Sequence, residues 1–512
     1  MRPQKILVLD FGGQYDQLIA RRVRDLHVYA EIKEYDKITP KEIKSEGYRG
    51  IIFTGGPNSV YDENSPHYDV SVLRLGIPVL GICYGAQLIA YMEGGTVGNA
   101  GGSGEYGEIS LRVDSDLLFE GVPCESRCFM SHRDSIMTVP EGFAITATTP
   151  KCPVAAMSHK DRAIYAVQFH PEVEHTEYGD QVLSNFLFKV CGLDGDWKMD
   201  DFVESAIDRC RQELAGRTVL LGLSGGVDSS VTAALLSKAI GKDLTMVFVD
   251  HGMLRKNEGD LVEKIFGSMF GSRFIRVNAE DRFLEKLKGV TEPERKRKII
   301  GEEFVRVFEA IAETLGEPDL LAQGTIYPDI VESGKGGSAT IKSHHNVGGL
   351  PDVIEFKGII EPLKELFKDE VREVGRRLGL PEELVSRQPF PGPGLGVRVI
   401  GEITKDKLNT LREADSIFRE EVDRLPKEKR PDQYFAVLTN TLSVGVKGDG
   451  RAYGLTVALR AVYTDDFMTA EWSRLPYETV AVAASRIANE IPEVTRVVYD
   501  VTSKPPATVE WE

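Results

Sequence analysis

The sequence predicts an α/β protein with two successive three-layer α/β domains, whose sheets are mostly parallel, followed by a small α+β domain. Three observations indicate this fold class. Apolar runs alternate with helical patterns up to about residue 191, a second alternation begins near residue 202, and a β-rich pattern follows a cluster of prolines and glycines at residues 389–394. Alternating strands and helices are typical of parallel sheets with helices on their faces. At about 100–200 residues per domain, the 512 residues correspond to about three domains.

The composition is that of a globular enzyme from a reducing compartment. Apolar residues make up 42% and charged residues 28% of the chain, as in ordinary folded domains. With 62 basic and 79 acidic residues the net charge is −17, which disfavours non-specific binding to nucleic acid or anionic membranes. No apolar run approaches the roughly 20 residues of a membrane-spanning helix. Six scattered cysteines are too few for a disulfide framework in a chain of this length, so we expect a cytoplasmic protein with neither a nucleic-acid nor a membrane partner.

The first domain is expected over residues 1–194. Its apolar runs predict strands, and periodic apolar residues between them predict helices. The expected strands are residues 5–10, 50–54, 77–82 and 163–167, and the expected helices cover residues 14–26 and begin near residue 86. A Gly/Asp-rich stretch at residues 192–196 breaks the pattern and is expected to be a linker.

The second and third domains are expected over residues 195–388 and 389–512. In the second we expect helices over residues 202–214 and 229–239, and strands at residues 218–223, 244–250, 273–277 and 320–323. The Pro/Gly cluster punctuates the chain too heavily to lie inside an element. Beyond it, the pattern predicts one clear helix over residues 479–491 and strands at residues 434–438, 455–462, 495–501 and 508–511.

Cys83 lies between a predicted strand and a predicted helix, with Gly81 before it and Gly85 after it. This pattern is typical of a nucleophile elbow, with cysteine as the nucleophile. The glycines permit a sharp backbone turn, and the start of a helix favours the thiolate form of the thiol. A lone cysteine is more often a buried apolar residue, so the interpretation depends on the partners that follow.

Attack by a thiolate on a carbonyl group requires a general base and an oxyanion hole. His170 can take the thiol proton, and Glu172 can orient its ring. The backbone N–H groups of Gly55, Gly56 and Tyr84 can bind the oxyanion. All these residues follow predicted strands, at the sheet edge where the active sites of α/β proteins gather. We therefore favour a catalytic site over a buried cysteine and a chance turn.

These motifs, together with residues 10–15 (DFGGQY) and 17–22 (QLIARR), resemble the class I, triad-type glutamine amidotransferases. The resemblance implies hydrolysis of glutamine to glutamate and ammonia through a γ-glutamyl thioester on Cys83. The chain departs from the family pattern at two positions. Arg133 stands in a segment that is often Ser-His-Gly-Asp in relatives, and Gly104 stands where many relatives have arginine.

A second motif, residues 224–230, follows a predicted strand and opens a predicted helix. Its members are Ser224, Gly225, Gly226, Val227, Asp228, Ser229 and Ser230. Successive backbone N–H groups at the start of a helix form an anion-binding cradle. The motif lacks the Gly-Lys-Ser/Thr ending of a Walker A loop, so we expect it to hold a leaving pyrophosphate, with Asp228 available for a metal ion.

This loop resembles the pyrophosphate loop of N-type ATP pyrophosphatases. The resemblance implies cleavage of ATP between its α- and β-phosphates, adenylation of a substrate oxygen, and Mg²⁺ as the cofactor, held in part by Asp228. The basic residues at positions 295–298 are by default a solvated helix face. One of the arginines there is nevertheless a candidate for binding a substrate phosphate.

The C-terminal residues 495–512, with residues 443–451, 459–462 and 464–470, resemble the C-terminal dimerisation domain of a family of ligases that transfer glutamine nitrogen to xanthosine monophosphate (XMP). The resemblance covers essentially the whole chain in the same domain order. It implies XMP, ATP and glutamine as substrates and a homodimer formed through the third domain. It also implies that XMP is contacted by Arg297, Asp449, Lys504 and Glu510, with Arg460 as a weaker candidate.

Three other interpretations stay open. Another glutamine-dependent ligase, such as an NAD or asparagine synthetase, would lack the C-terminal block. A tRNA-thiolating enzyme resembles the same loop but needs sulfur-carrying cysteines in the pyrophosphatase domain, where Cys210 precedes the loop and no cysteine follows it. A binding protein without activity would not need both an intact Cys83 set and an intact loop.

Overall fold

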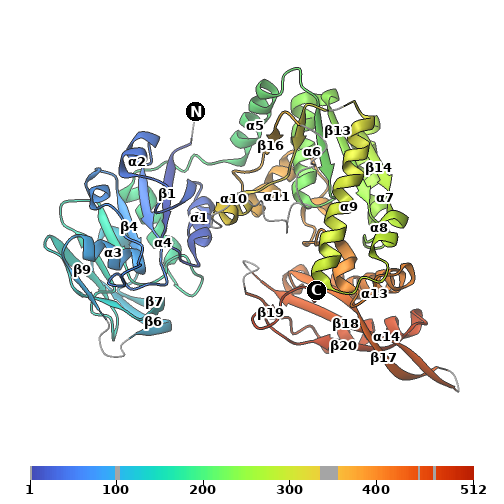
Figure 1. Cartoon of the computed structure of the whole chain (residues 1–512). Coiled ribbons are helices and arrows are strands. Elements are labelled where there is room, and N and C mark those ends of the chain that lie inside the picture. Colours follow the sequence, from blue (N-terminus) through green and yellow to red (C-terminus); the bar gives the residue numbers. More distant parts are fainter. Residues whose placement is uncertain (1–2, 99–103, 317, 335–355, 448–449, 465–468) are drawn as a thin grey trace. The chain divides into compact units, whose positions relative to one another are not determined.

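The structure, a computed structural model, describes residues 3–98, 104–316, 318–334, 356–447, 450–464 and 469–512 (Figure 1). The chain divides into two compact units, Met1–Phe202 and Val203–Glu512. Both units are α/β assemblies, as the sequence predicts. In the described part of the chain, no helix combines the length and the apolar character needed to cross a bilayer.

The first unit is built on a nine-stranded sheet with the order β2-β1-β3-β4-β11-β10-β9-β6-β7. Its strands are β1 (Lys5–Asp10), β2 (Tyr29–Glu34), β3 (Gly50–Phe53), β4 (Val79–Ile82), β6 (Glu105–Val113), β7 (Glu125–His132), β9 (Phe143–Thr148), β10 (Ala156–His159) and β11 (Ile164–Val167). A separate pair is formed by β5 (Thr96–Gly98) and β8 (Ser135–Thr138). The helices are α1 (Asp16–Asp25), α2 (Pro40–Glu46), α3 (Tyr84–Met92) and α4 (Gly179–Ser184), and α5 (Met199–Glu213) begins where this unit ends.

Half of this sheet is parallel and half is antiparallel. Strands β2, β1, β3, β4 and β11 run parallel, and every pair from β11 to β7 is antiparallel. The parallel strands read as continuous apolar runs because both of their faces are covered: β3 and β4 are buried at every residue. In β6, by contrast, buried and exposed residues largely alternate. Such half-polar strands lack the apolar runs on which the prediction rested, so the antiparallel half was not expected.

The second unit begins with a parallel sheet in the order β14-β13-β12-β15-β16. Its strands are β12 (Val219–Leu223), β13 (Leu244–Asp250), β14 (Phe274–Asn278), β15 (Leu320–Ala322) and β16 (Ile359–Ile360). The accompanying helices are α6 (Val227–Ile240), α7 (Glu258–Phe270), α8 (Glu280–Leu287), α9 (Pro293–Thr314), α10 (Tyr327–Gly334), α11 (Lys368–Arg377) and α12 (Glu382–Val385). The four strands predicted here agree with the observed bounds to within one residue.

The C-terminal part of this unit is a mixed sheet with two helices. The long hairpin of β17 (Gln433–Lys447) and β18 (Gly450–Tyr463) is joined by β19 (Glu471–Trp472), antiparallel to β18, and by β20 (Val494–Asp500), parallel to β18. Helices α13 (Lys405–Asp423) and α14 (Tyr477–Glu490) pack on it. One continuous apolar core includes Leu220 and Val247 of the parallel sheet as well as Phe418, Leu459 and Ile487 of the C-terminal part. The separate domains predicted on either side of residue 389 therefore share a core.

The strand predicted at residues 508–511 is wrong, because within the described residues 469–512 the last strand is β20. The backbone carbonyl oxygens of Thr508 and Val509 instead accept hydrogen bonds from the side chain of Arg460, each at 2.7 Å. The buried guanidinium of Arg460 thus forms hydrogen bonds with backbone carbonyl groups that would otherwise pair with a neighbouring strand.

Candidate active sites

Cys83 lies at a sharp turn between β4 and α3, as the sequence predicts. Its backbone adopts φ +52° and ψ −106°, a conformation that residues other than glycine rarely adopt. A Cβ atom built on Gly81 would lie 2.6 Å from the carbonyl oxygen of Gly85, and one built on Gly85 would lie 2.5 Å from that of Phe53. Side chains at positions 81 and 85 would therefore collide with the turn itself or with β3, which explains why both positions are glycine.

His170 and Glu172 follow β11, the strand beside β4, and form a buried pair. Their exposed fractions are 4% and 1%. Nδ1 of His170 donates a hydrogen bond to Oε1 of Glu172 at 2.7 Å, because an ionised carboxylate can only accept. Burial lowers the pKa of His170, but the charge of Glu172 and the hydrogen bond with the Cys83 thiol raise it well above its ordinary value. The imidazole is thus suited to take and hold the thiol proton.

A glycine loop after β3 lies against both the thiol and the imidazole. A Cβ atom built on Gly55 would lie 3.6 Å from Cε1 of His170 and 3.8 Å from Cβ of Cys83, and one built on Gly56 would lie 3.2 Å from the Tyr84 ring. No described residue accepts a hydrogen bond from the backbone N–H groups of Gly55, Gly56 or Tyr84. These N–H groups are therefore available to a substrate oxygen beside the thiol.

Two further groups that were not predicted from the sequence contact the thiol. The side-chain amide of Gln168 donates to Sγ of Cys83 at 3.7 Å, and Sγ donates to the carbonyl oxygen of Ser131 at 3.8 Å. Gln168 is fully buried and accepts a hydrogen bond from Gln87 at 3.2 Å. In the sequence, the only indication of Gln168 was its position two residues before His170. Ser131 lies on β7, in the antiparallel half of the sheet, so no local pattern could have connected it with Cys83.

The two departures from the amidotransferase pattern, Gly104 and Arg133, are neighbours in space. A Cβ atom built on Gly104 would lie 2.8 Å from the carbonyl oxygen of His132 and 3.4 Å from Cα of Arg133. A side chain at position 104 would therefore displace the end of the β6–β7 pair. The arginine of this chain instead extends from the adjacent backbone, with its side chain 68% exposed.

Residues 224–230 follow β12 in the predicted order: residues 224–226 form the turn, and residues 227–230 are the first residues of α6. The loop is held by its own serines: the Oγ atoms of Ser224 and Ser229 lie 3.0 Å apart, and Oγ of Ser230 donates to the carbonyl oxygen of Gly226 at 2.6 Å. Gly225 has φ +73°, which favours glycine. The turn leads directly into the 14-residue helix α6, so its backbone lies at a helix start, the kind of position at which proteins bind anions.

Two cationic side chains that were not predicted from the sequence reach this loop from far along the chain. Lys368, the first residue of α11, donates to both carboxylate oxygens of Asp228 at 2.7 and 2.6 Å. Arg387 donates to the carbonyl oxygen of Gly225 at 2.7 Å and also pairs with Glu258. They lie 140 and 162 residues beyond their partners, so no local spacing connects them to the loop. The cradle lacks a lysine of its own but receives one from α11.

Buried cations hold the C-terminal tail. Arg398 donates to both carboxylate oxygens of Glu510 at 2.9 and 2.7 Å, and Lys296 pairs with the carboxylate of Glu512. Arg460 is fully buried. Its hydrogen bonds go to the carboxylate of Asp500 and to the carbonyl oxygens of Thr502, Thr508 and Val509. The weaker XMP candidate Arg460 therefore contacts groups of the chain itself.

The other XMP candidates lie on or beside this tail where the structure describes them. Arg297 donates to the main-chain oxygen of Glu512, so it reaches the segment that carries Lys504 and Glu510. The backbone of Lys504 pairs with that of Ala470 through two hydrogen bonds, at 2.7 and 3.0 Å. Asp449 lies outside the described residues. An open cavity of about 810 Å³ adjoins the tail, and its lining includes Pro293, Thr439, Asn440, Arg496, Trp511 and Glu512.

Three family descriptions match consecutive parts of the chain: glutamine amidotransferase class-I over residues 7–190, NAD synthase over residues 198–260, and GMP synthase C terminal domain over residues 420–511. Proteins described as glutamine-hydrolysing GMP synthases are similar from end to end. Those of Acetivibrio thermocellus and Finegoldia magna are 59% and 58% identical over 513 residues, and one of Clostridium botulinum is 59% identical over 515; each alignment covers 100% of both chains. A solved glutamine amidotransferase from Thermotoga maritima, 19% identical, covers 42% of this chain and 86% of its own with a TM-score of 0.29.

The chain belongs to the glutamine-hydrolysing GMP synthase family. It is therefore a ligase that uses ATP, and the resemblance found in the sequence is confirmed. Membership of the GMP synthase family also decides against an NAD or asparagine synthetase, which would lack the C-terminal block, and against a tRNA-thiolating enzyme.

Proposed function

We propose that this chain makes GMP from XMP in guanine nucleotide synthesis, using glutamine as the nitrogen donor and ATP as the activating substrate. Glutamine and water give glutamate and ammonia; ATP, XMP and ammonia give GMP, AMP and pyrophosphate. The observation that carries the proposal is the similarity to GMP synthases over 100% of the chain. The buried thiol–imidazole–carboxylate set and the loop at the start of α6 support one half-reaction each.

The first half-reaction is assigned to Cys83, His170 and Glu172. His170 takes the thiol proton, and Sγ of Cys83 attacks the side-chain carbonyl carbon of glutamine. The C–N bond then breaks, ammonia leaves with the proton from His170, and a γ-glutamyl thioester remains. Water attacks the thioester with His170 again as the base, which releases glutamate and restores the thiol. Glu172 keeps the imidazole in the orientation and tautomer that these proton transfers need.

The negative charge that develops on the glutamine carbonyl oxygen requires donors. The N–H groups of Gly55, Gly56 and Tyr84 are assigned this role, because they adjoin the thiol and no described residue uses them. They are held by the backbone turn and need not reorganise when the charge forms.

The second half-reaction is assigned to residues 224–230. Oxygen O2 of XMP attacks the α-phosphorus of ATP while the loop holds the departing pyrophosphate, and ammonia then displaces AMP at C2 of the purine. Lys368, 2.6 Å from the carboxylate of Asp228, adds positive charge where the pyrophosphate leaves. This contact supports assigning an electrostatic role to α11.

The residues at the loop fit the Mg²⁺ ion that the family implies. Mg²⁺ is usually bound by one or two carboxylates together with substrate phosphates. Asp228 offers such a carboxylate, and it has lone pairs beyond those used by Lys368. Asp228 would hold the ion, which would supply charge stabilisation to the phosphate oxygens.

XMP binding is assigned to Arg297, Asp449, Lys504 and Glu510. The contact between Arg297 and Glu512 supports this assignment, because it brings the start of α9 to the C-terminal tail. A basic side chain suits the phosphate of XMP, and a carboxylate accepts hydrogen bonds from ring N–H or ribose hydroxyl groups.

A homodimer formed through the C-terminal part is also proposed. On β17 the alternate residues Leu442, Val444 and Val446 are 66%, 48% and 76% exposed, and Tyr453, opposite Val444 on β18, is 72% exposed. An apolar stripe of this kind on an exposed hairpin fits burial against a second copy.

All six cysteines are free thiols, which supports the cytoplasm as the compartment.

The deciding experiment compares the wild type with Cys83→Ala in an assay that follows XMP to GMP with ATP and either glutamine or an ammonium salt. We expect the variant to lose glutamine-driven synthesis and to keep ammonium-driven synthesis, because only the first half-reaction uses the thiol. Cys124→Ala is the matched control, since Cys124 is exposed.

Two outcomes would contradict the proposal. If the wild-type protein leaves XMP unchanged with either nitrogen donor, XMP is not the molecule that accepts the nitrogen. A folded Cys83→Ala variant that loses both activities would show that the two half-reactions are not divided between the two sites.

A further inference from the structure

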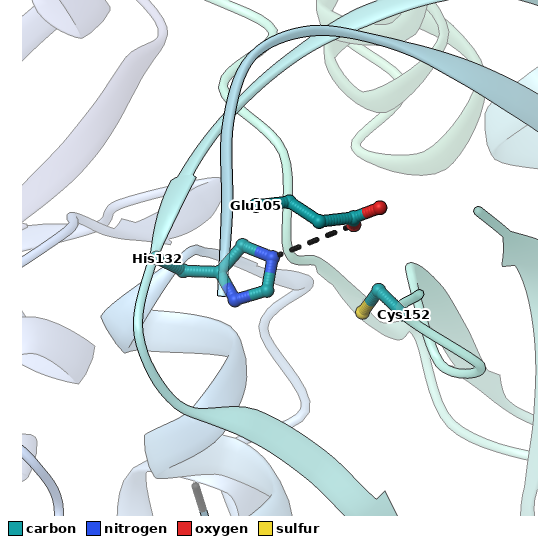
Figure 2. Close-up of side chains that lie close together, drawn as sticks. All are labelled: Glu105, His132 and Cys152. Carbon is teal, nitrogen blue, oxygen red and sulfur yellow. Dashed lines mark ion pairs between the residues drawn. The ribbon is translucent and has the colours of Figure 1, made fainter. Parts of the chain in front are cut away.

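Three buried side chains that the proposed reactions do not use converge in the first unit: Glu105, His132 and Cys152 (Figure 2). Glu105 begins β6 and His132 ends β7, where the two are register partners, and Cys152 lies in the connection between β9 and β10. Their exposed fractions are 3%, 4% and 0%. A carboxylate oxygen, a ring nitrogen and the sulfur all lie within 4.8 Å of one another.

The contacts of His132 indicate which of its ring nitrogens carries the proton and which offers a lone pair to the other two side chains. Nδ1 lies 2.9 Å from the carbonyl oxygen of Asp134. A carbonyl oxygen can only accept, so Nδ1 carries the proton. Nε2 of that tautomer presents a lone pair, and it is a buried atom without a hydrogen-bond partner.

The neighbours of Nε2 offer electron pairs as well. Oε2 of Glu105 lies 3.7 Å from Nε2, beyond hydrogen-bond distance, and it accepts a hydrogen bond from Thr149 at 2.6 Å. The thiol of Cys152 directs its proton to the carbonyl oxygen of Val154 at 3.4 Å. Three electron-pair donors thus face one another in a buried site, with no proton shared between them. A cation would satisfy all three.

We propose that Glu105, His132 and Cys152 bind a divalent transition-metal ion of the Zn²⁺ type, with water as the fourth ligand. The proposal goes beyond the proposed function, since no step of that function uses these residues.

The ligand types select the metal. Sulfur, imidazole nitrogen and carboxylate oxygen are the three ligands of protein zinc sites, whereas Mg²⁺ and Ca²⁺ take oxygen ligands. Ligand atoms on a tetrahedral zinc ion are separated by about 3.5 Å, so modest side-chain rotations would close the set. A metal-binding histidine usually donates its other ring N–H to a carbonyl or carboxylate oxygen, and His132 already donates Nδ1–H to Asp134.

The charges also balance. On binding, the Sγ–metal bond forms and the thiol proton of Cys152 leaves to solvent, so a thiolate and the Glu105 carboxylate together neutralise the dication. The assembly that is buried is then neutral, which avoids the cost of an uncompensated charge. The carbonyl oxygen of Ser131, the residue before His132, contacts the Cys83 thiol at 3.8 Å. An ion at this site would therefore fix the strand end beside that thiol.

The test uses Co²⁺ as a spectroscopic probe on the full-length Cys83→Ser chain, reduced and freed of metal with a chelator. Removing the Cys83 thiol prevents the Cys83–His170 pair from producing the same signal. We expect one Co²⁺ per chain, with sulfur-to-cobalt charge-transfer absorption and the visible bands of a tetrahedral ion, both removed when Zn²⁺ is added.

Added to the same background, Cys152→Ser should abolish the charge-transfer absorption, and Glu105→Gln or His132→Gln should weaken Co²⁺ binding by at least about tenfold. Cys124→Ser, which removes an exposed thiol, is the matched control and should leave the spectrum unchanged. Absorption that survives Cys152→Ser, or an absence of binding by the parent chain, would overturn the proposal.

A second measurement needs no further variant and covers the case in which a ligand variant does not fold. X-ray absorption at the zinc edge of the Zn²⁺-loaded Cys83→Ser chain should show one sulfur at about 2.3 Å and nitrogen or oxygen ligands at about 2.0–2.2 Å. A first coordination shell without sulfur would refute the assignment.

Discussion

The thiol of Cys83 is placed by the backbone of a single residue. Its φ of +52° lies in a region that costs a non-glycine residue of order 1–3 kcal/mol, and such strain persists only where the surrounding structure imposes it. Here the turn lies tightly against β3 and the start of α3, because a Cβ atom at position 81 or 85 would lie 2.6 or 2.5 Å from a backbone carbonyl oxygen. The triad could be predicted from the sequence, since each member lies next to a recognisable strand end. Gln168 and the carbonyl group of Ser131 could not, because their contacts with the thiol arise from side-chain packing and from an unpredicted strand.

Glu172→Gln should lower the glutaminase kcat by roughly 10²–10⁴. The carboxylate raises the pKa of His170, so in the variant the imidazolium loses its proton at lower pH. The alkaline limb of the pH–rate profile should move to lower pH. Glutaminase kcat between pH 6 and 10 is the measurement, with Glu174→Gln, an exposed carboxyl two residues away, as the control. A variant with wild-type kcat would remove Glu172 from the site.

His251, at the end of β13, makes stability depend on pH. Burial lowers its pKa to about 4, and the charge of Asp250 offsets this only in part. The unfolded chain, with a His pKa of about 6.5, binds the proton more readily. Stability therefore falls as pH decreases from about 6.5 to 4, by about 3 kcal/mol in total.

His251→Asn should flatten this dependence, because asparagine keeps an acceptor for the backbone N–H of Met253 and has no proton to gain. Denaturant unfolding of the second unit at pH 7.5, 5.5 and 4.5 measures the slope. Measured in the full-length chain, His175→Asn, at an exposed histidine of the first unit, is the control and should leave the slope of the second unit unchanged. Equal slopes in the wild type and His251→Asn would contradict this account.

At the scale of elements, the charged side chains assigned to function lie at the starts of helices and in the C-terminal tail. The first residue of α11 reaches the loop before α6, and the tail beyond β20 is held by side chains of other elements. The strands of the parallel sheets were predicted because apolar runs between turn signals are local features. The tail was predicted as a strand because Thr508 and Val509 favour one; the buried guanidinium of Arg460 decided otherwise.

Lys368→Met should lower ATP-dependent GMP formation by roughly 10², because it removes the cation beside Asp228 while keeping the length of the side chain. Glutaminase activity should not change. AMP and pyrophosphate release with an ammonium salt as the nitrogen donor is the measurement. Lys364→Met, at an exposed lysine four residues earlier, is the matched control. If both variants release pyrophosphate at the wild-type rate, Lys368 has no part in ATP cleavage.

At the scale of the molecule, the chain forms two compact units, and residues 192–196, which were expected to be a linker, lie within the first, Met1–Phe202. They are bound to the first unit. The backbone N–H of Gln4 donates to the carboxylate of Asp196 at 3.1 Å. Trp197 is 7% exposed, and its ring centroid lies 4.7 Å from that of Tyr29. The Gly/Asp composition indicated a break in regular structure but not whether the segment docks.

A fragment of residues 1–198 should therefore be more stable than one of residues 1–194, by about 3 kcal/mol, because the shorter fragment loses the buried indole ring. Urea unfolding of the two fragments gives the difference. Trp197→Ala in the longer fragment should reproduce most of the loss. Equal midpoints for the two fragments would show that the segment contributes nothing to the first unit.

Local patterns were sufficient to predict which segments form strands and helices in succession along the chain. They were also sufficient to predict the glycine turns, the thiol elbow, the serine-rich loop and the family resemblance that these motifs carry. They were sufficient because a turn, a helix start or a buried strand depends on residues close together in the sequence. Folding alone decided the antiparallel half of the first sheet, the reach of Lys368 and Arg387 to the loop, the docking of Trp197, the burial of Arg460 under the tail and the meeting of Glu105, His132 and Cys152. Each of these joins residues far apart along the chain, and the energy of such contacts depends on packing that no local pattern records.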